Sequence, residues 1–176
     1  MAKSKARFAA LAAAVLVVAA AATWYFASPA WTLRQMKAAA DANDPDALNP
    51  YIDYPALRED LKAEIMVQMR AEAKKDTSGF GPLGLAIGTA MIGPVIDGVV
   101  SPAGMRAALT ARRDQVRSGA GRRAASVLHV PDDPVIVRRG LSEFLVATKR
   151  EPASGLVFKR HGLSWKLSGV ELPPNG

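Results

Sequence analysis

The sequence predicts an α+β fold: an N-terminal transmembrane helix, then a helical half of about four helices packed on a small C-terminal antiparallel sheet of three to four strands. Three observations predict this fold. An uncharged apolar run follows a short basic start, apolar residues then recur at helical spacing, and from residue 135 they alternate as in strands. The 176-residue chain, with 49% hydrophobic and 22% charged side chains, has the composition of one globular domain.

Residues 1–27 form the predicted anchor. The start is basic, with Lys3, Lys5 and Arg7, and the stretch from Phe8 to Ala27 carries no charge. About 20 helical residues cover about 30 Å, the thickness of a bilayer's hydrocarbon core. Basic residues before the span predict a cytoplasmic N-terminus, and the aromatic residues 24–26 suit the outer interface. We therefore expect a single-pass inner-membrane protein whose residues 28–176 form one exported α+β domain in the periplasm.

Two alternatives to this topology stay open. A cleaved signal peptide, cut at residues 20–22 or 28–30, leaves a soluble periplasmic protein. The length of the apolar run and the proline in the second cleavage site favour the uncleaved anchor. The other alternative has two spans and a cytoplasmic C-terminus, because residues 80–96 are also uncharged and barely long enough to cross a bilayer.

Helix signals follow the anchor. Ser28-Pro29 and Ser101-Pro102 each place a capping serine before a proline at the first helical position. We expect the helix that starts at Ser28 to end at the turn residues 43–46. Between the two signals, apolar residues recur every four positions over residues 55–75, which predicts a helix capped by Asp53.

The segment 79–100 combines high hydrophobicity with helix-breaking residues. It is apolar apart from Asp97, yet it contains six glycines together with Pro82 and Pro94. Each glycine or proline costs about 1–3 kcal/mol in a helix interior, so we expect a broken and buried helical hairpin here. Gly84 and Gly88 have the spacing that permits close contact between helices.

Four runs near the C-terminus predict the antiparallel sheet. A short β-branched run at 135–137 is followed by runs at 144–148, 156–160 and 163–167, and apolar and polar residues alternate clearly in the last of these. His161-Gly162 is predicted to form a tight turn. After Gly169 the apolar phase shifts, which indicates a bulge or a bend.

Four short segments carry a resemblance to a known family: 28–33, 51–58, 101–104 and 160–167. Through these segments, which occur in the same order, the chain resembles a bacterial family recorded as a domain of unknown function, number twenty-nine thirty-nine. The resemblance implies a membrane-tethered α+β envelope protein. It implies no activity, cofactor or catalytic residue.

Candidate ligand-binding residues are few. Asp97 is a lone carboxylate in an apolar stretch, so it requires a partner or solvent. Two interpretations stay open: a helix-end residue paired with an arginine such as Arg106, or a carboxylate that lines a ligand cavity. Tyr51, Asp53 and Tyr54 form either the polar rim of a pocket or a helix cap with tyrosines packed around it.

The sequence contains no convincing catalytic, metal or nucleotide motif. The absence of cysteine excludes disulfides and thiolate chemistry. His129 and His161 lack the spacing of paired metal ligands, and the G-x-G-x-x-G string at 79–84 contains a proline and follows no strand. We therefore expect no cofactor and no metal, and the balance favours a protein that is not an enzyme. The alternative is an enzyme with a carboxylate site at Asp53 and Asp97.

A basic cluster precedes the strands: Arg112, Arg113, Arg117, Arg122 and Arg123. In an exported protein these side chains meet phosphates mainly on lipids, at about 1 kcal/mol each near an anionic surface, and we expect no nucleic acid. A solvated loop is the alternative.

The expected function is a membrane-anchored envelope module that binds membrane lipid through its N-terminal helix and an apolar ligand, a lipid or a partner protein through its domain. A structural or assembly factor of the cell envelope is the alternative.

Overall fold

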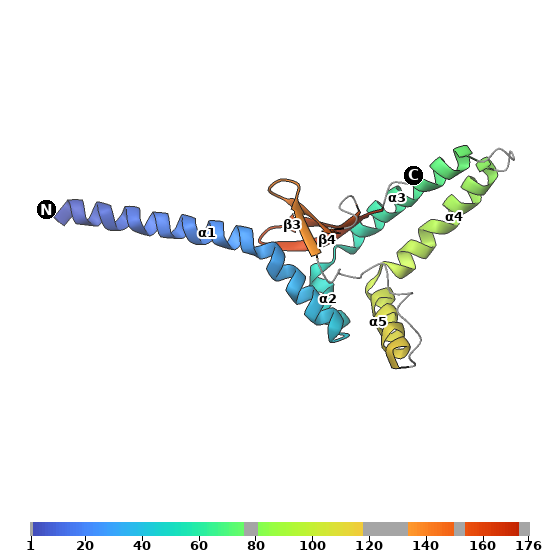
Figure 1. The fold of residues 1–176 in the computed structure, drawn as a ribbon, viewed down its shortest axis with the longest axis horizontal. Helices are drawn as coiled ribbons and strands as arrows, with labels where there is room; N and C mark the ends of the chain where they lie inside the picture. The colour runs from blue at the N-terminus through green and yellow to red at the C-terminus, as the bar shows by residue number, and fades with distance from the viewer. Residues whose placement is uncertain (1, 76–80, 118–133, 150–153, 173–176) are drawn as a thin grey trace.

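The computed structural model describes residues 2–75, 81–117, 134–149 and 154–172. In chain order its elements are α1 (Ala2–Asp41), α2 (Pro45–Leu48), the 3-10 turn η1 (Asn49–Tyr51), α3 (Tyr54–Lys75), α4 (Gly81–Val99), α5 (Pro102–Arg117), β1 (Pro134–Arg138), β2 (Glu143–Thr148), β3 (Gly155–His161) and β4 (Ser164–Glu171). The predicted α+β fold is confirmed. Figure 1 shows α1 extending alone from one side of a small body, while α3 and α4 project from the opposite side.

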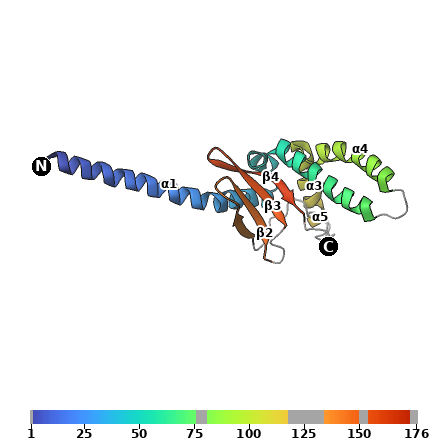
Figure 2. The same cartoon turned by 90° about the horizontal axis from the view of Figure 1, so that it is seen from above.

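The N-terminal helix α1 is longer than predicted. It continues from Ala2 to Asp41 and therefore passes through the boundary predicted at residue 27. Among the described residues it is the one helix that is, by itself, long and apolar enough for a membrane anchor or a signal sequence. Helices α4 and α5 meet that criterion only as a pair, and the pair is bent by 76°. Figure 2 shows the first part of α1 standing free of the body and its last part packed beside the sheet.

The prediction that Ser28-Pro29 begins a helix is wrong, because Pro29 lies inside α1. A proline has no N–H, so the carbonyl of Tyr25, four residues earlier, lacks its helical partner. That carbonyl instead accepts hydrogen bonds from Ser28 Oγ and from Arg138 Nη2, each at 3.1 Å. The buried Ser28 hydroxyl also accepts the indole N–H of Trp165 at 2.9 Å. Side chains of the sheet therefore form hydrogen bonds with α1 at the position of its proline.

The predicted sheet is confirmed as a meander of antiparallel strands in the order β1-β2-β3-β4. The short β-branched run forms its edge strand, β1. The pairing of β3 with β4 shifts register between Val157 and Phe158, so Ser168 is an extra residue on β4. The bulge predicted next to Gly169 is therefore present. Gly162, with a φ of 63°, occupies the predicted tight turn.

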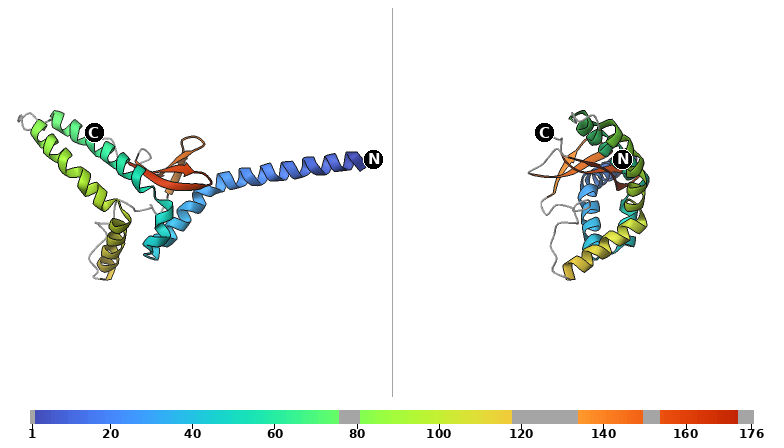
Figure 3. Two further views of the ribbon diagram at one scale, coloured as in Figure 1. Left: turned by 180° about the vertical axis from the view of Figure 1, so that it is seen from behind. Right: turned by 90° about the vertical axis from the view of Figure 1, so that its right-hand side faces the viewer.

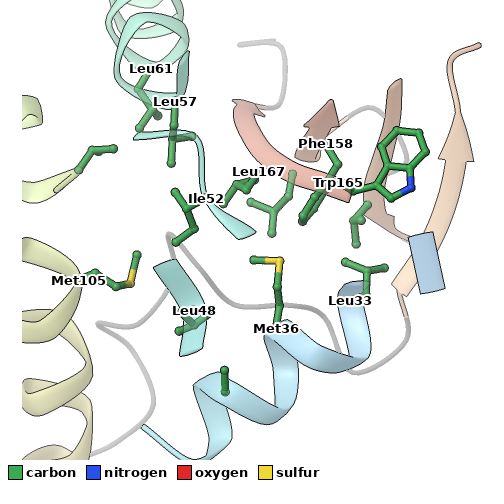
Figure 4. Packing of buried hydrophobic residues seen from close by; sticks show 14 of the residues in the cluster. Leu33, Met36, Leu48, Ile52, Leu57, Leu61, Met105, Phe158, Trp165 and Leu167 are labelled. Atoms are coloured by element: carbon green, nitrogen blue, oxygen red, sulfur yellow. The ribbon is translucent and has the colours of Figure 1, made fainter. Parts of the chain in front are cut away.

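The core lies between the sheet, the second part of α1 and the start of α3. Figure 4 shows Leu33 and Met36 of α1 facing the buried side chains of the sheet. Phe144 and Phe158 stack with ring centroids 4.8 Å apart, and Trp165 meets Phe144 edge-on at 4.9 Å. Such pairs add about 0.5–1.5 kcal/mol beyond the burial of their surface. The rest of this core is largely aliphatic and includes Leu48, Ile52, Leu57, Leu61 and Leu167.

Two predicted helix caps are confirmed. Asp53 Oδ1 accepts the N–H of Ala56 at 3.2 Å at the start of α3. Ser101 Oγ accepts the N–H of Gly104 at 3.0 Å at the start of α5. Each bond satisfies a backbone donor that the first helical turn leaves free, which typically stabilises a helix by about 1 kcal/mol. Helix α5 then continues to Arg117.

The segment 79–100 contains one helix, α4, rather than the predicted broken hairpin. Pro94 lies inside this helix without ending it. Figure 3 shows α4 running alongside α3, and a Cβ atom placed on Gly88 would be only 2.2 Å from Cε of Met69. This close packing against α3 compensates for the weak helix propensity of the sequence. The prediction that the segment is buried is also wrong, because the side of α4 turned away from α3 is exposed.

Candidate functional site

Asp97 lies near the end of α4 and pairs with α3 rather than with the predicted arginine. Its Oδ1 atom accepts a hydrogen bond from Lys62 Nζ at 2.6 Å, and the two side chains are 47% and 36% exposed. Arg106 instead pairs with Asp46 of α2 at 2.5 Å. The predicted Asp97–Arg106 pair is therefore wrong, because Lys62 lies opposite Asp97 where α3 and α4 run side by side. An ion pair this exposed contributes about 0–1 kcal/mol.

Tyr51, Asp53 and Tyr54 lie together where η1 leads into α3. Besides capping α3, the Asp53 carboxylate pairs through Oδ2 with Nε2 of His161 at 3.1 Å. The Tyr54 hydroxyl donates to Oδ1 of Asn49 at 2.5 Å, and burial raises the pKa of Tyr54 above its ordinary value. Asp53 and Tyr54 thus have partners inside the fold, as expected for a helix start. A ligand-binding role for these three residues stays a prediction.

The predicted basic cluster falls only partly within the described residues. The last turns of α5 carry Arg112, Arg113 and Arg117, whereas Arg122, Arg123 and His129 lie outside the described ranges. Within those ranges, no group of three His, Cys, Asp or Glu side chains is placed to hold a metal ion. The lipid-binding role of the cluster stays a prediction.

The outer side of α4 is an exposed apolar surface, here called the α4 face, formed by Gly84, Ile87, Met91, Pro94 and Gly98. Ile87 and Met91 are 55% and 65% exposed. Nothing lies within 4 Å of the positions where Gly84 and Gly98 would carry a Cβ atom. The five residues are separated by three and four positions in alternation, which is the spacing of a coiled-coil seam. Sequence reasoning assigned this segment to the core and missed the exposed seam.

The α4 face is uncharged and is distant from the free part of α1. Figures 1 and 3 place α4 at the end of the molecule opposite to the N-terminal end of α1. The one charged residue of α4, Asp97, lies beside the face and is paired with Lys62. A surface of this composition is suited to an apolar contact with another helix.

A second surface, which the sequence did not predict, surrounds Tyr25 where the free part of α1 meets the sheet. The guanidinium carbons of Arg138 and Arg160 lie 4.9 and 5.0 Å from the centroid of the Tyr25 ring. We call these three residues the arginine site. Neither of its arginines forms an ion pair with a carboxylate of the described residues. Their neighbour Arg139, in contrast, donates to both carboxylate oxygens of Glu171.

A repeated tripeptide in the sequence marks this second surface. Gly-Leu-Ser occurs at residues 140–142, in the turn between β1 and β2, and again at 162–164, where the turn after β3 leads into the first residue of β4. Because the strands form a meander, both turns lie at the same end of the sheet. The backbone N–H of Arg160 donates to the carbonyl of Ser142 at 2.8 Å and joins them. The repeat was the signal available in the sequence, but its significance depends on Tyr25, more than a hundred residues earlier.

The fold and these surfaces define a protein with a long apolar N-terminal helix that continues into a small α+β body. The chain belongs to the family described as protein of unknown function (DUF2939), which matches residues 18–108. This confirms the resemblance, although the closing segment 160–167 lies outside the matched residues. The match begins within the apolar run of α1 and extends into α5, so it covers the helical half of the fold. No curated protein and no solved structure matches the chain.

Proposed function

We propose that this protein is a membrane-anchored, non-catalytic module of the bacterial cell envelope, and that its exported domain assembles with a second copy of itself through the α4 face. The observation that carries the proposal is the exposure of Ile87 and Met91, at 55% and 65%, on a helix that points away from the anchor. Covering such a surface with a second apolar surface removes it from water and is favourable.

The way α1 enters the domain supports an anchor that is retained. Its second part supplies Leu33 and Met36 to the core, and its proline joint is bonded to the sheet through Ser28 and Trp165. Cleavage within residues 28–30 would cut this joint. A retained α1 is one helix that runs from the lipid into the core of the domain, so it serves as a structural element and not only as a targeting signal.

The position of α4 favours protein over lipid as the occupant of the α4 face. A bilayer that holds the free part of α1 lies at the end of the molecule opposite to α4, as Figures 1 and 2 indicate. The α4 face therefore meets water or another protein rather than that bilayer. A helix of a partner protein, with its own apolar seam, is the surface that complements it.

A second copy is the partner that the anchor favours. Two copies in one membrane share the same orientation, so a two-fold axis along the membrane normal brings the same face of both α4 helices together. Equivalent residues then meet across the axis, Ile87 and Met91 fill the middle of the seam, and the exposed glycines at its ends permit close approach. Confinement of both anchors to one membrane raises the local concentration of the α4 face above that of a freely diffusing domain, so a small interface suffices.

Other occupants of the α4 face are an apolar small ligand or an envelope protein of different sequence, for which the chain would act as an assembly factor. The enzyme alternative places a carboxylate site at Asp53 and Asp97. Both carboxylates already bond within the fold, to His161 and to Lys62. That alternative requires an activity that is lost in the Asp53→Asn, Asp97→Asn double variant.

Disulfide crosslinking tests the self-assembly directly, because the chain has no cysteine of its own. Single variants Ile87→Cys and Met91→Cys should form a covalent dimer in oxidised membranes, since both positions lie on the proposed two-fold seam. Ala86→Cys is the matched control: it lies on the same helix and is exposed, but it points away from the seam.

The crosslinked product distinguishes the occupants. A dimer of twice the chain mass with Ile87→Cys and Met91→Cys, but not with Ala86→Cys, supports a second copy. Equal yields at all three positions indicate random collision in the membrane and contradict the seam. Monomer at all three positions also contradicts the proposal and leaves the α4 face to an apolar ligand or to a different protein.

A further inference from the structure

We propose that Arg138 and Arg160, together with Tyr25, bind the phosphate group of an anionic phospholipid at the surface of the membrane that holds α1. The inference rests on the anchor part of the proposed function, a retained α1, and is independent of self-assembly through α4. It assigns a ligand to the arginine site, which lies at the opposite end of the domain from the α4 face.

Both guanidinium groups are held in place by the protein. Arg138 Nη2 donates to the carbonyls of Tyr25 and Phe26 at 3.1 and 3.2 Å, and Arg160 Nε donates to the carbonyl of Gly162 at 2.9 Å. Both cations also lie within about 5 Å of the centroid of one aromatic ring, that of Tyr25. Two fixed positive charges are thus gathered at one ring with no carboxylate from the described residues to balance them.

A mobile anion relieves this imbalance of charge. Arginine presents several N–H donors in a planar fork that matches the oxygens of a phosphate. Within the described part of the chain, Arg160 donates a side-chain hydrogen bond only through Nε, so its terminal nitrogens remain for a ligand. Arg138 Nη1 is buried without a hydrogen-bond partner in the described fold, so this atom does not reach the ligand and Arg138 acts on the phosphate mainly through its charge.

The site lies at the height where lipid phosphates are expected. Tyr25 is the middle residue of an aromatic triplet that ends the apolar run, and its neighbours Trp24 and Phe26 are 52% and 68% exposed. Exposed tryptophan, tyrosine and phenylalanine at the end of a membrane helix mark the headgroup level. The guanidinium groups beside Tyr25 are therefore at the level of the phosphates rather than in bulk water.

The two Gly-Leu-Ser turns complete the membrane-facing surface. Leu141 and Leu163 at their tips are 78% and 77% exposed, and the Tyr25 hydroxyl donates to the carbonyl of Leu141 at 2.9 Å. Because both turns lie at the same end of the sheet, the two leucines expose apolar side chains on one side of the domain. At a membrane surface they enter the boundary between headgroups and acyl chains, next to the phosphate that the arginines bind.

Native mass spectrometry of the full-length chain, released from membranes that contain equal phosphatidylglycerol and phosphatidylcholine, tests this assignment. The wild-type chain should retain phosphatidylglycerol in preference to phosphatidylcholine. The Arg138→Gln, Arg160→Gln double variant should lose that preference, by about fivefold for each arginine. Lys159→Gln is the matched control, because it removes one positive charge from the exposed neighbour of Arg160 on the same strand.

Because Arg138 also supports α1 at its proline, the single variant Arg160→Gln provides the result if the double variant does not fold. An unchanged lipid preference in Arg160→Gln, or an equal loss in Lys159→Gln, would overturn the proposal. Displacement of the lipid by excess glycerol phosphate would assign the site to a soluble phosphate instead and would also overturn it. The same spectra give the chain mass, so a cleaved anchor is recognised separately from a failure of the arginine site.

Discussion

Replacing Ser28 by alanine tests how the N-terminal helix is joined to the domain. The Ser28 hydroxyl is the acceptor for the indole N–H of Trp165 at 2.9 Å, and Trp165 is only 1% exposed. The alanine variant leaves that N–H buried without an acceptor, which costs about 1–3 kcal/mol. For a chain of this size, each kcal/mol lowers the melting temperature by about 2–4 °C.

Thermal unfolding of the full chain in detergent micelles, followed by near-ultraviolet circular dichroism, measures this loss. Thr23→Ala is the control, because the Thr23 hydroxyl bonds only to the carbonyl of Ala19 within the same helix. A double-mutant cycle with Trp165→Phe adds a second check: once the indole N–H is absent, Ser28→Ala should cost much less. If the Ser28→Ala protein has the same melting temperature as Thr23→Ala and wild type, the Ser28–Trp165 bond does not hold α1 to the domain, and the reasoning is refuted.

Three further substitutions follow from the contacts of the fold. Asp97→Asn removes an exposed ion pair and should change the free energy of unfolding by less than about 1 kcal/mol in urea titration. Asp53→Ala removes the cap of α3 and the partner of His161, so the same titration should show a loss of about 1–2 kcal/mol. Gly155→Ala places a Cβ atom 2.1 Å from the backbone oxygen of Val146, so limited proteolysis should show a largely unfolded sheet.

For each of these three substitutions, a specific result would contradict the expectation. A large loss in Asp97→Asn would mean that this carboxylate does more than form a surface pair. An unchanged free energy of unfolding in Asp53→Ala would show that the capping bond does not stabilise α3. A Gly155→Ala protein as resistant to protease as wild type would contradict the pairing of β2 with β3 described above.

The features that the sequence predicted correctly are those set by neighbouring residues. Asp53 and Ser101 cap helices because the groups that they bond lie three residues away. Strand alternation and the bulge beside Gly169 are likewise visible within a few residues. Such local signals specified the helices and the antiparallel sheet well enough to predict the α+β fold.

The features that were mispredicted depend on distant partners. Ser28 has the signature of a helix cap, but its hydroxyl bonds to Trp165, 137 positions later in the chain. Helix α4 persists despite its glycines because α3 packs against Gly88, and no local rule includes that neighbour. The arginine site combines α1, β1 and β3, so composition alone could not reveal it.

The central claim is that α1 is retained as an anchor and as part of the fold. The intact mass of the chain recovered from carbonate-washed membranes tests it most directly. We expect the protein in the membrane fraction, with the 18.6 kDa mass of residues 1–176. A shorter chain that begins after residue 20, or a full-length chain in the soluble fraction, would contradict it.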